Sequence, residues 1–122
     1  MNYFLTLLLL TSTLTSCANV RRQLGQALIT DETEMKLGTK FAAEIEAKEK
    51  IHPDRRLQAY IQRVATPLIK NALQDRPNIE YNIKVIDDPK QINAFAVPGG
   101  FLYVYSGLLL IAEDAAEIAG IL

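Results

Sequence analysis

The stretch INAFAVPGGFLYVY, residues 92–105, decides the fold of this sequence. Two apolar runs, Ile92–Val97 and Phe101–Tyr105, flank the turn residues Pro98-Gly99-Gly100. Glycine reaches positive φ at little steric cost, so the stretch predicts a β-hairpin shaped by these three turn residues. Alternate residues of the second run share a face, with Phe101, Tyr103 and Tyr105 on one side and Leu102 and Val104 on the other.

Upstream of the hairpin, IEYNIKVI at residues 79–86 alternates apolar and polar positions, which predicts a half-buried strand. Before it, an amphipathic helix is predicted from Asp31 to near Lys50, with Asp31 and Glu34 as a capping box. Its expected apolar stripe is Leu37, Phe41 and Ile45. Its expected solvated face holds Glu34, Lys40, Glu44, Lys48 and Glu49.

A second helix is predicted to begin at Pro53 and Asp54. Pro67 lies inside it and removes a backbone donor, which predicts a kink or break near Ala65. His52, just before this helix, is interpreted as a surface or capping residue. The expected buried stripe of this helix is Leu57, Ile61, Val64, Leu68 and Ala72.

After the hairpin, residues 108–112 predict a short helical stretch, and Asp114 with Glu117 predicts a capped helix at the end of the sequence. The apolar residues of this last helix are expected to lack packing partners, because it stops after about two turns. The order of elements predicts an α+β fold in which N-terminal helices pack on a small, mostly antiparallel sheet with a hairpin.

Composition bounds the function. The 122 residues carry a net charge of −1, which argues against a nucleic-acid binder. One cysteine and one histidine exclude an intrachain disulfide and a His-rich metal site. We therefore assign no catalytic residue and no metal ligand to this sequence.

The amino terminus is interpreted as a targeting segment. Residues 1–16 have the short apolar core of a signal peptide, although Lys and Arg are absent from its start. Cys17 follows Leu14-Thr15-Ser16, which resembles a bacterial lipobox, so Cys17 is the predicted lipidation site. An ordinary signal peptide with an incidental cysteine is the alternative. With Cys17 lipidated, residues 17–30 are predicted to be a lipid-anchored tether, and residues 31–122 the N-terminal part of the folded domain.

A lipidated Cys17 predicts a protein held on a membrane of the bacterial cell envelope and facing the periplasm. The small neutral residue Ala18 follows the cysteine, and in this the sequence resembles lipoproteins that are routed to the outer membrane.

The run DDPKQINAFAVPGGFLYVYSGLLLIAEDAAEIAGIL, residues 87–122, resembles the zinc metallopeptidases grouped with the CAAX prenyl protease, HtpX and BepA (Ste-type endopeptidases). ITDETEMKLG and DRRLQAYIQRV, which begin at Ile29 and Asp54, are similar to the BepA-type N-terminal region. The resemblance therefore spans residues 29–122 and implies an incomplete zincin-like fold.

In that family the helix begun at Asp114 continues into His-Glu-x-x-His, whose histidines bind zinc and whose glutamate activates the metal-bound water. None of those residues follows here. We therefore expect an N-terminal fragment that is inactive alone, with zinc as the cofactor of the full-length protein and its ligands outside this sequence.

The resemblance further implies that Asn93, Ala94, Phe95 and Ala96 border the cleft and bind an extended polypeptide substrate by strand addition. The small side chains of Ala94 and Ala96 would allow a close approach, and Asn93 offers an amide donor and acceptor. An ordinary hairpin with Phe95 in the core is the alternative.

Two functions follow from these observations. The first is a zinc-dependent metalloendopeptidase of the cell envelope that acts in proteolysis and protein quality control. The second is a non-catalytic envelope lipoprotein that binds extended polypeptides through the hairpin edge strand. Both predict a polypeptide partner and a membrane contact through Cys17.

Overall fold

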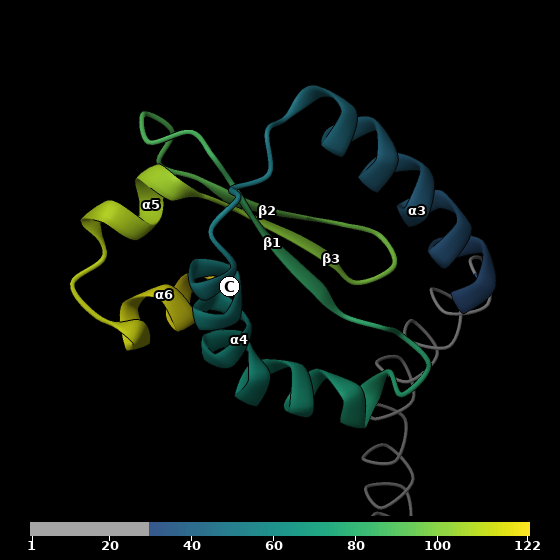
Figure 1. The fold of residues 1–122 in the computed structure, drawn as a ribbon. Coiled ribbons are helices and arrows are strands. Elements are labelled where there is room, and N and C mark those ends of the chain that lie inside the picture. The colour runs from purple at the N-terminus through teal and green to yellow at the C-terminus, as the bar shows by residue number, and fades with distance from the viewer. Residues whose placement is uncertain (1–29) are drawn as a thin grey trace, which may run out of the picture. The chain divides into compact units, whose positions relative to one another are not determined.

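The computed structural model describes residues 30–122, and its central element is a three-stranded sheet (Figure 1). The strands are β1 (Asn82–Ile86), β2 (Ala94–Val97) and β3 (Phe101–Tyr105), in the spatial order β1-β3-β2. The predicted signal peptide, the lipidation site Cys17 and the tether up to residue 29 lie outside the described residues.

The predicted α+β fold and its hairpin are confirmed. β2 and β3 are antiparallel and joined by a turn in which Gly99 and Gly100 have φ of 80° and 85°. The sheet is mixed, however, because β1 pairs with β3 in parallel. The segment after β1 carries the chain past the position of β3, so antiparallel pairing among the three strands is confined to the hairpin.

Helix α3 (Asp31–Lys48) covers one face of the sheet, as Figure 1 shows. Ala42 of this helix packs with Ile86 and Tyr103 in the smaller of two core clusters. The aromatic face predicted for the third strand is therefore the face that meets α3.

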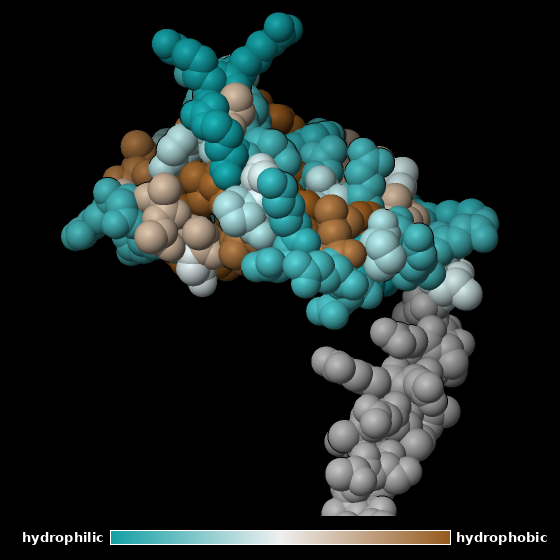
Figure 2. Space-filling model, turned by 90° about the horizontal axis from the view of Figure 1, so that it is seen from below, coloured by the Kyte–Doolittle hydropathy of each residue, from teal (hydrophilic) through white to brown (hydrophobic). Residues whose placement is uncertain are grey.

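The opposite face of the sheet is covered by α4 (Arg55–Asp75) and α6 (Ala115–Ile121), with α5 (Ser106–Ile111) at the end of β3. The larger core lies here and consists of Ile61, Ala65, Ile83, Val85, Val104, Leu108 and Ile118. Each large aliphatic side chain buried in this way contributes about 1.5–3 kcal/mol. On the side of the molecule seen from below, apolar residues remain visible between hydrophilic ones (Figure 2).

The face that α3 buries differs from the predicted apolar stripe. Gly38 and Ala42 are buried, whereas Leu37 and Phe41 are 41% and 38% exposed. A Cβ on Gly38 would lie 1.9 Å from the carbonyl oxygen of Pro98, so the turn of the hairpin sits directly on this glycine. The close approach of turn and helix selects the face that α3 buries.

The predicted capping box of α3 is wrong. The helix already includes Asp31, and the carboxylates of Asp31 and Glu34 accept hydrogen bonds from Arg76. Glu34 is consequently 20% exposed at its side chain and does not belong to the solvated face. Lys40, Glu44 and Lys48 are exposed, as expected.

Helix α4 begins as predicted, with Asp54 as N-cap accepting from the Arg56 amide at 2.8 Å. A kink or break was expected near Ala65, and the structure shows no break: α4 runs through Pro67 without interruption. Pro67 is exposed, so its ring points away from the sheet.

Helix α6 begins at its predicted cap, where Asp114 accepts from the amides of Ala116 and Glu117. The side chain of Glu117 accepts from the Glu113 amide, whereas in a capping box it would accept from the amide of Asp114. Ile118 is 3% exposed in the larger core, so the expectation that it lacks packing partners is wrong. Within residues 30–122, no helix combines the length and the apolar composition that a membrane span requires.

Candidate functional site

The candidate site is the outer edge of β2. In the described part of the chain, β2 is hydrogen-bonded to a strand on one side only. Tyr105 donates its amide to the Asn93 carbonyl at 3.0 Å, and the register continues with Phe95 opposite Tyr103. Antiparallel pairs alternate, so the backbone groups of Phe95 point to β3 while those of Ala94 and Ala96 point outward. The two alanines thus offer donors and acceptors to an added strand.

The other edge of the sheet is covered at the Val85–Ile86 end of β1. Outside β1, Ile51 forms a bridge with Ile86, and the His52 amide donates to the Val85 carbonyl at 2.8 Å. The side chain of Gln58, from α4, accepts from the Val85 amide at 3.1 Å. The free edge of β2 is therefore distinct from the edge of β1, which the chain itself covers.

The four predicted site residues all lie in or next to β2, but the side chain of Phe95 packs against the smaller core. Asn93 lies just before β2 and is exposed, and Ala94, Phe95 and Ala96 belong to the strand. The Phe95 ring stacks on Tyr103 with the ring centroids 5.3 Å apart, so this side chain takes part in the smaller core, as the alternative interpretation has it. That role leaves the backbone edge formed by the two alanines unaffected.

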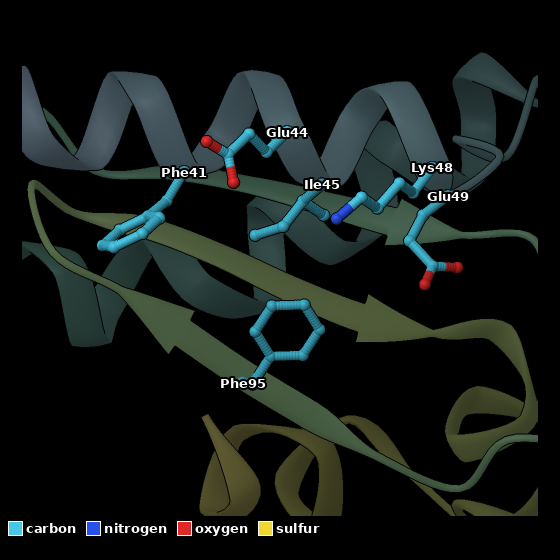
Figure 3. A pocket seen from close by; sticks show the side chains of 6 residues that line it. All are labelled: Phe41, Glu44, Ile45, Lys48, Glu49 and Phe95. Atoms are coloured by element: carbon cyan, nitrogen blue, oxygen red, sulfur yellow. The ribbon is translucent and has the colours of Figure 1, made fainter.

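Each face of β2 borders a pocket. On the α3 side, a groove of about 150 Å³ lies between the helix and Phe95, lined also by Phe41, Glu44, Ile45, Lys48 and Glu49. Figure 3 shows Phe41 and Ile45 extending from α3 toward the ring of Phe95. On the opposite side, a pocket of about 190 Å³ lies between β2 and the end of α6, lined by Ala94, Phe95, Ala96, Leu102, Tyr103, Ile121 and Leu122.

An ion-pair network positions the hairpin that carries this edge. Glu34 of α3 accepts from the Gly99 amide at 3.0 Å and from Arg76 at 2.6 Å. Arg76, which follows α4, also donates to Asp31 at 3.0 Å. The hydrogen bonds from Arg76 hold the pKa of both carboxyls below their ordinary values, and the carboxylates raise the pKa of Arg76. Both helices and the turn are fixed to one another at this point.

A second polar group joins α3 to the sheet. Glu46 accepts from Lys84 of β1 at 2.7 Å and from the Tyr103 hydroxyl of β3 at 3.0 Å. Burial, followed by the adjacent Glu46 carboxylate, raises the pKa of Tyr103 well above its ordinary value. The Tyr103 hydroxyl therefore stays protonated and serves as a donor.

The described residues do not fit a zinc site. No group of three or more His, Cys, Asp or Glu side chains gathers within residues 30–122. His52 accepts from the Asp54 amide through Nδ1 at 3.2 Å, and its Nε2 lies 3.8 Å from Asp87 Oδ1. His52 therefore accepts from the amide of Asp54, the N-cap residue of α4, and a tetrahedral zinc site would need further N or S ligands.

Several residues that shape the site were not predicted from sequence. No local pattern marks Gln58, Arg76 or Gly38, because each acts through a partner far away in the chain. Phe41 was assigned to a buried stripe, and its partial exposure follows only from the rotation of α3. The glycine among the helix-forming residues of α3 was the one available signal.

Comparison with known proteins supplies the remaining finding. The family model described as Peptidase family M48 matches residues 52–122, more than half of the chain. The matched part contains α4, the whole sheet, α5 and α6. No curated protein matches this chain.

Proposed function

The chain belongs to peptidase family M48, and on this basis we propose that it provides the polypeptide-binding edge of a zinc-dependent metalloendopeptidase of the cell envelope. Peptidases act on polypeptides, and an extended polypeptide is the ligand that a free strand edge binds. The observation that carries the proposal is the asymmetry of the sheet, whose β1 edge is covered at Val85 and Ile86 while β2 pairs with a strand on one side only within residues 30–122.

The proposed binding is strand addition on Ala94 and Ala96. The outward amides and carbonyls of these residues would exchange hydrogen bonds with the main chain of the polypeptide, which depends little on its sequence. The small side chains allow the added strand to approach closely. Because the described residues do not fit zinc, no step of peptide-bond hydrolysis is assigned to any of them.

A proline substitution tests this binding directly. Ala96→Pro removes one outward amide, and proline is tolerated on an edge strand whose N–H faces solvent. We expect the full 122-residue chain to bind a fluorescent, threonine-rich nonapeptide by anisotropy and Ala96→Pro to bind it at least about tenfold more weakly, a loss of about 1.4 kcal/mol. Ala96→Ser keeps the amide and is the matched control. Equal binding by both variants would contradict the proposal.

Anchoring in the envelope is a separate part of the proposal and rests on the lipobox-like sequence before Cys17. In bacteria fed a radiolabelled fatty acid, the wild-type chain should incorporate label and partition with membranes. Cys17→Ser should abolish both. Unlabelled wild-type protein would overturn the anchor and leave the proposed peptide binding intact.

A further inference from the structure

The groove between α3 and β2 lies at the free edge of the sheet. Phe95 is the only sheet residue among those that line it, and the others, Phe41, Glu44, Ile45, Lys48 and Glu49, follow one side of α3 and its end. Because Phe95 belongs to the edge strand, the groove borders the space that an added strand would occupy. We name these six residues the α3 groove.

The pleat of the sheet determines which side chain of a bound polypeptide meets the α3 groove. The residue opposite Phe95 in an added strand projects its side chain to the same face as Phe95, with the Cβ atoms about 4.5–5.5 Å apart. Its two neighbours project to the other face, toward the pocket near Ile121 and Leu122. Every second side chain therefore lies on the α3 side of the sheet, and the one opposite Phe95 is the one that meets the α3 groove.

The lining of the α3 groove selects an apolar side chain. Its floor consists of the rings of Phe41 and Phe95 and the aliphatic side chain of Ile45, and Phe41 is 38% exposed. Its rim carries both signs of charge, with Lys48 between Glu44 and Glu49, so no single charge is favoured. Its volume of about 150 Å³ is comparable to that of a cavity that accepts a benzene ring.

We propose that the α3 groove is a specificity pocket for one large apolar side chain, from leucine to phenylalanine in size, of a polypeptide bound along β2. This inference rests on the proposed function, because the pleat alignment requires strand addition. It assigns to α3, which lies outside the part of the chain matched by the family model, a role in choosing the substrate.

The experiment uses the full chain and nonapeptides of threonine with a single central residue, which is alanine, leucine, phenylalanine or lysine. We expect the leucine and phenylalanine peptides to bind about tenfold or more tightly than the alanine peptide, because burial of such a side chain is worth about 1.5–3 kcal/mol. Phe41→Ala should reduce this preference several-fold. Leu37→Ala, equally exposed on the same helix but outside the groove, should leave it unchanged.

The outcomes test strand addition on β2 and the specificity pocket in the α3 groove separately. If all four peptides bind equally well and Ala96→Pro weakens them all, the specificity pocket is overturned and strand addition stands. A preference for lysine would also overturn it, in favour of the rim carboxylates. If no peptide binds, both fail. Should Phe41→Ala misfold by circular dichroism, the peptide series on the wild-type chain alone still decides.

Discussion

The position of the hairpin turn depends on the ionised carboxylate of Glu34. This carboxylate accepts from Arg76 and from the Gly99 amide, so it holds the turn before β3 in place. The pKa of Glu34 and Asp31 lies below their ordinary values of 4.5 and 3.8, chiefly because of hydrogen bonds from Arg76. A lowered folded-state pKa means stability that is present above the ordinary value and is lost as the pH falls through the lowered one.

We therefore expect the melting temperature to fall as the pH drops below 4.5, the ordinary pKa of Glu34, and to fall less steeply in Glu34→Gln. At neutral pH, Glu34→Gln should destabilise the fold by about 1–2 kcal/mol, because it weakens charge-assisted hydrogen bonds. Glu32→Gln is the control, since Glu32 is 77% exposed and its ion pair is with exposed Lys36. Thermal unfolding of the wild type and both variants is followed by circular dichroism at each pH. Melting temperatures of wild type and Glu34→Gln that fall in parallel with pH would refute the stabilising role of the Glu34 carboxylate.

At the scale of elements, α3 and the hairpin turn pack backbone against backbone. Gly38 leaves no room for a Cβ, which would lie 1.9 Å from the Pro98 carbonyl oxygen. This contact sets the distance between α3 and β2 and therefore the width of the α3 groove.

Gly38→Ala is expected to destabilise the chain by about 1–3 kcal/mol in urea unfolding, because a forced backbone shift outweighs the gain in helix propensity. Gly120→Ala is the matched control. Gly120 lies in α6 with nothing within 4 Å of a Cβ, so alanine there should stabilise by up to about 1 kcal/mol. Stabilisation by both substitutions would show that α3 does not need this close approach.

The covered edge of β1 provides a second test at this scale. Gln58→Met removes the acceptor of the Val85 amide, which belongs to a fully buried residue, and should cost about 1–3 kcal/mol. Gln62→Met is the control. Gln62 lies one turn further along α4 and is exposed, so this substitution should change the free energy of unfolding by less than about 0.5 kcal/mol. Equal urea midpoints for the two variants would mean that Gln58 does not close this edge.

For the whole molecule, local signals predicted the elements and distant contacts determined the site. Pro98-Gly99-Gly100 and Asp54 act on their immediate neighbours, so the hairpin and the start of α4 could be predicted. The parallel pairing of β1 with β3 and the contact of Gly38 with Pro98 join segments far apart in sequence. Periodicity alone therefore misplaced the buried face of α3 and could not reveal which edge of the sheet is free.

The candidate site likewise depends on both local sequence signals and contacts between distant segments. The sequence predicted Asn93–Ala96 in a strand beside a turn, and the resemblance implied that this strand binds a polypeptide at its edge. Only the sheet order shows that Ala94 and Ala96 lie at an edge, and only α3 provides the groove beside Phe95.

Amide hydrogen exchange of the chain, with and without a saturating leucine-centred nonapeptide, tests the proposed binding edge most directly. The amides of Ala94 and Ala96 should become protected when the peptide is added. The amide of Phe95 should be slow in both states, because it already pairs with β3. Protection that appears along β1, or an exchange pattern that the peptide leaves unchanged at Ala94 and Ala96, would contradict binding at the edge of β2.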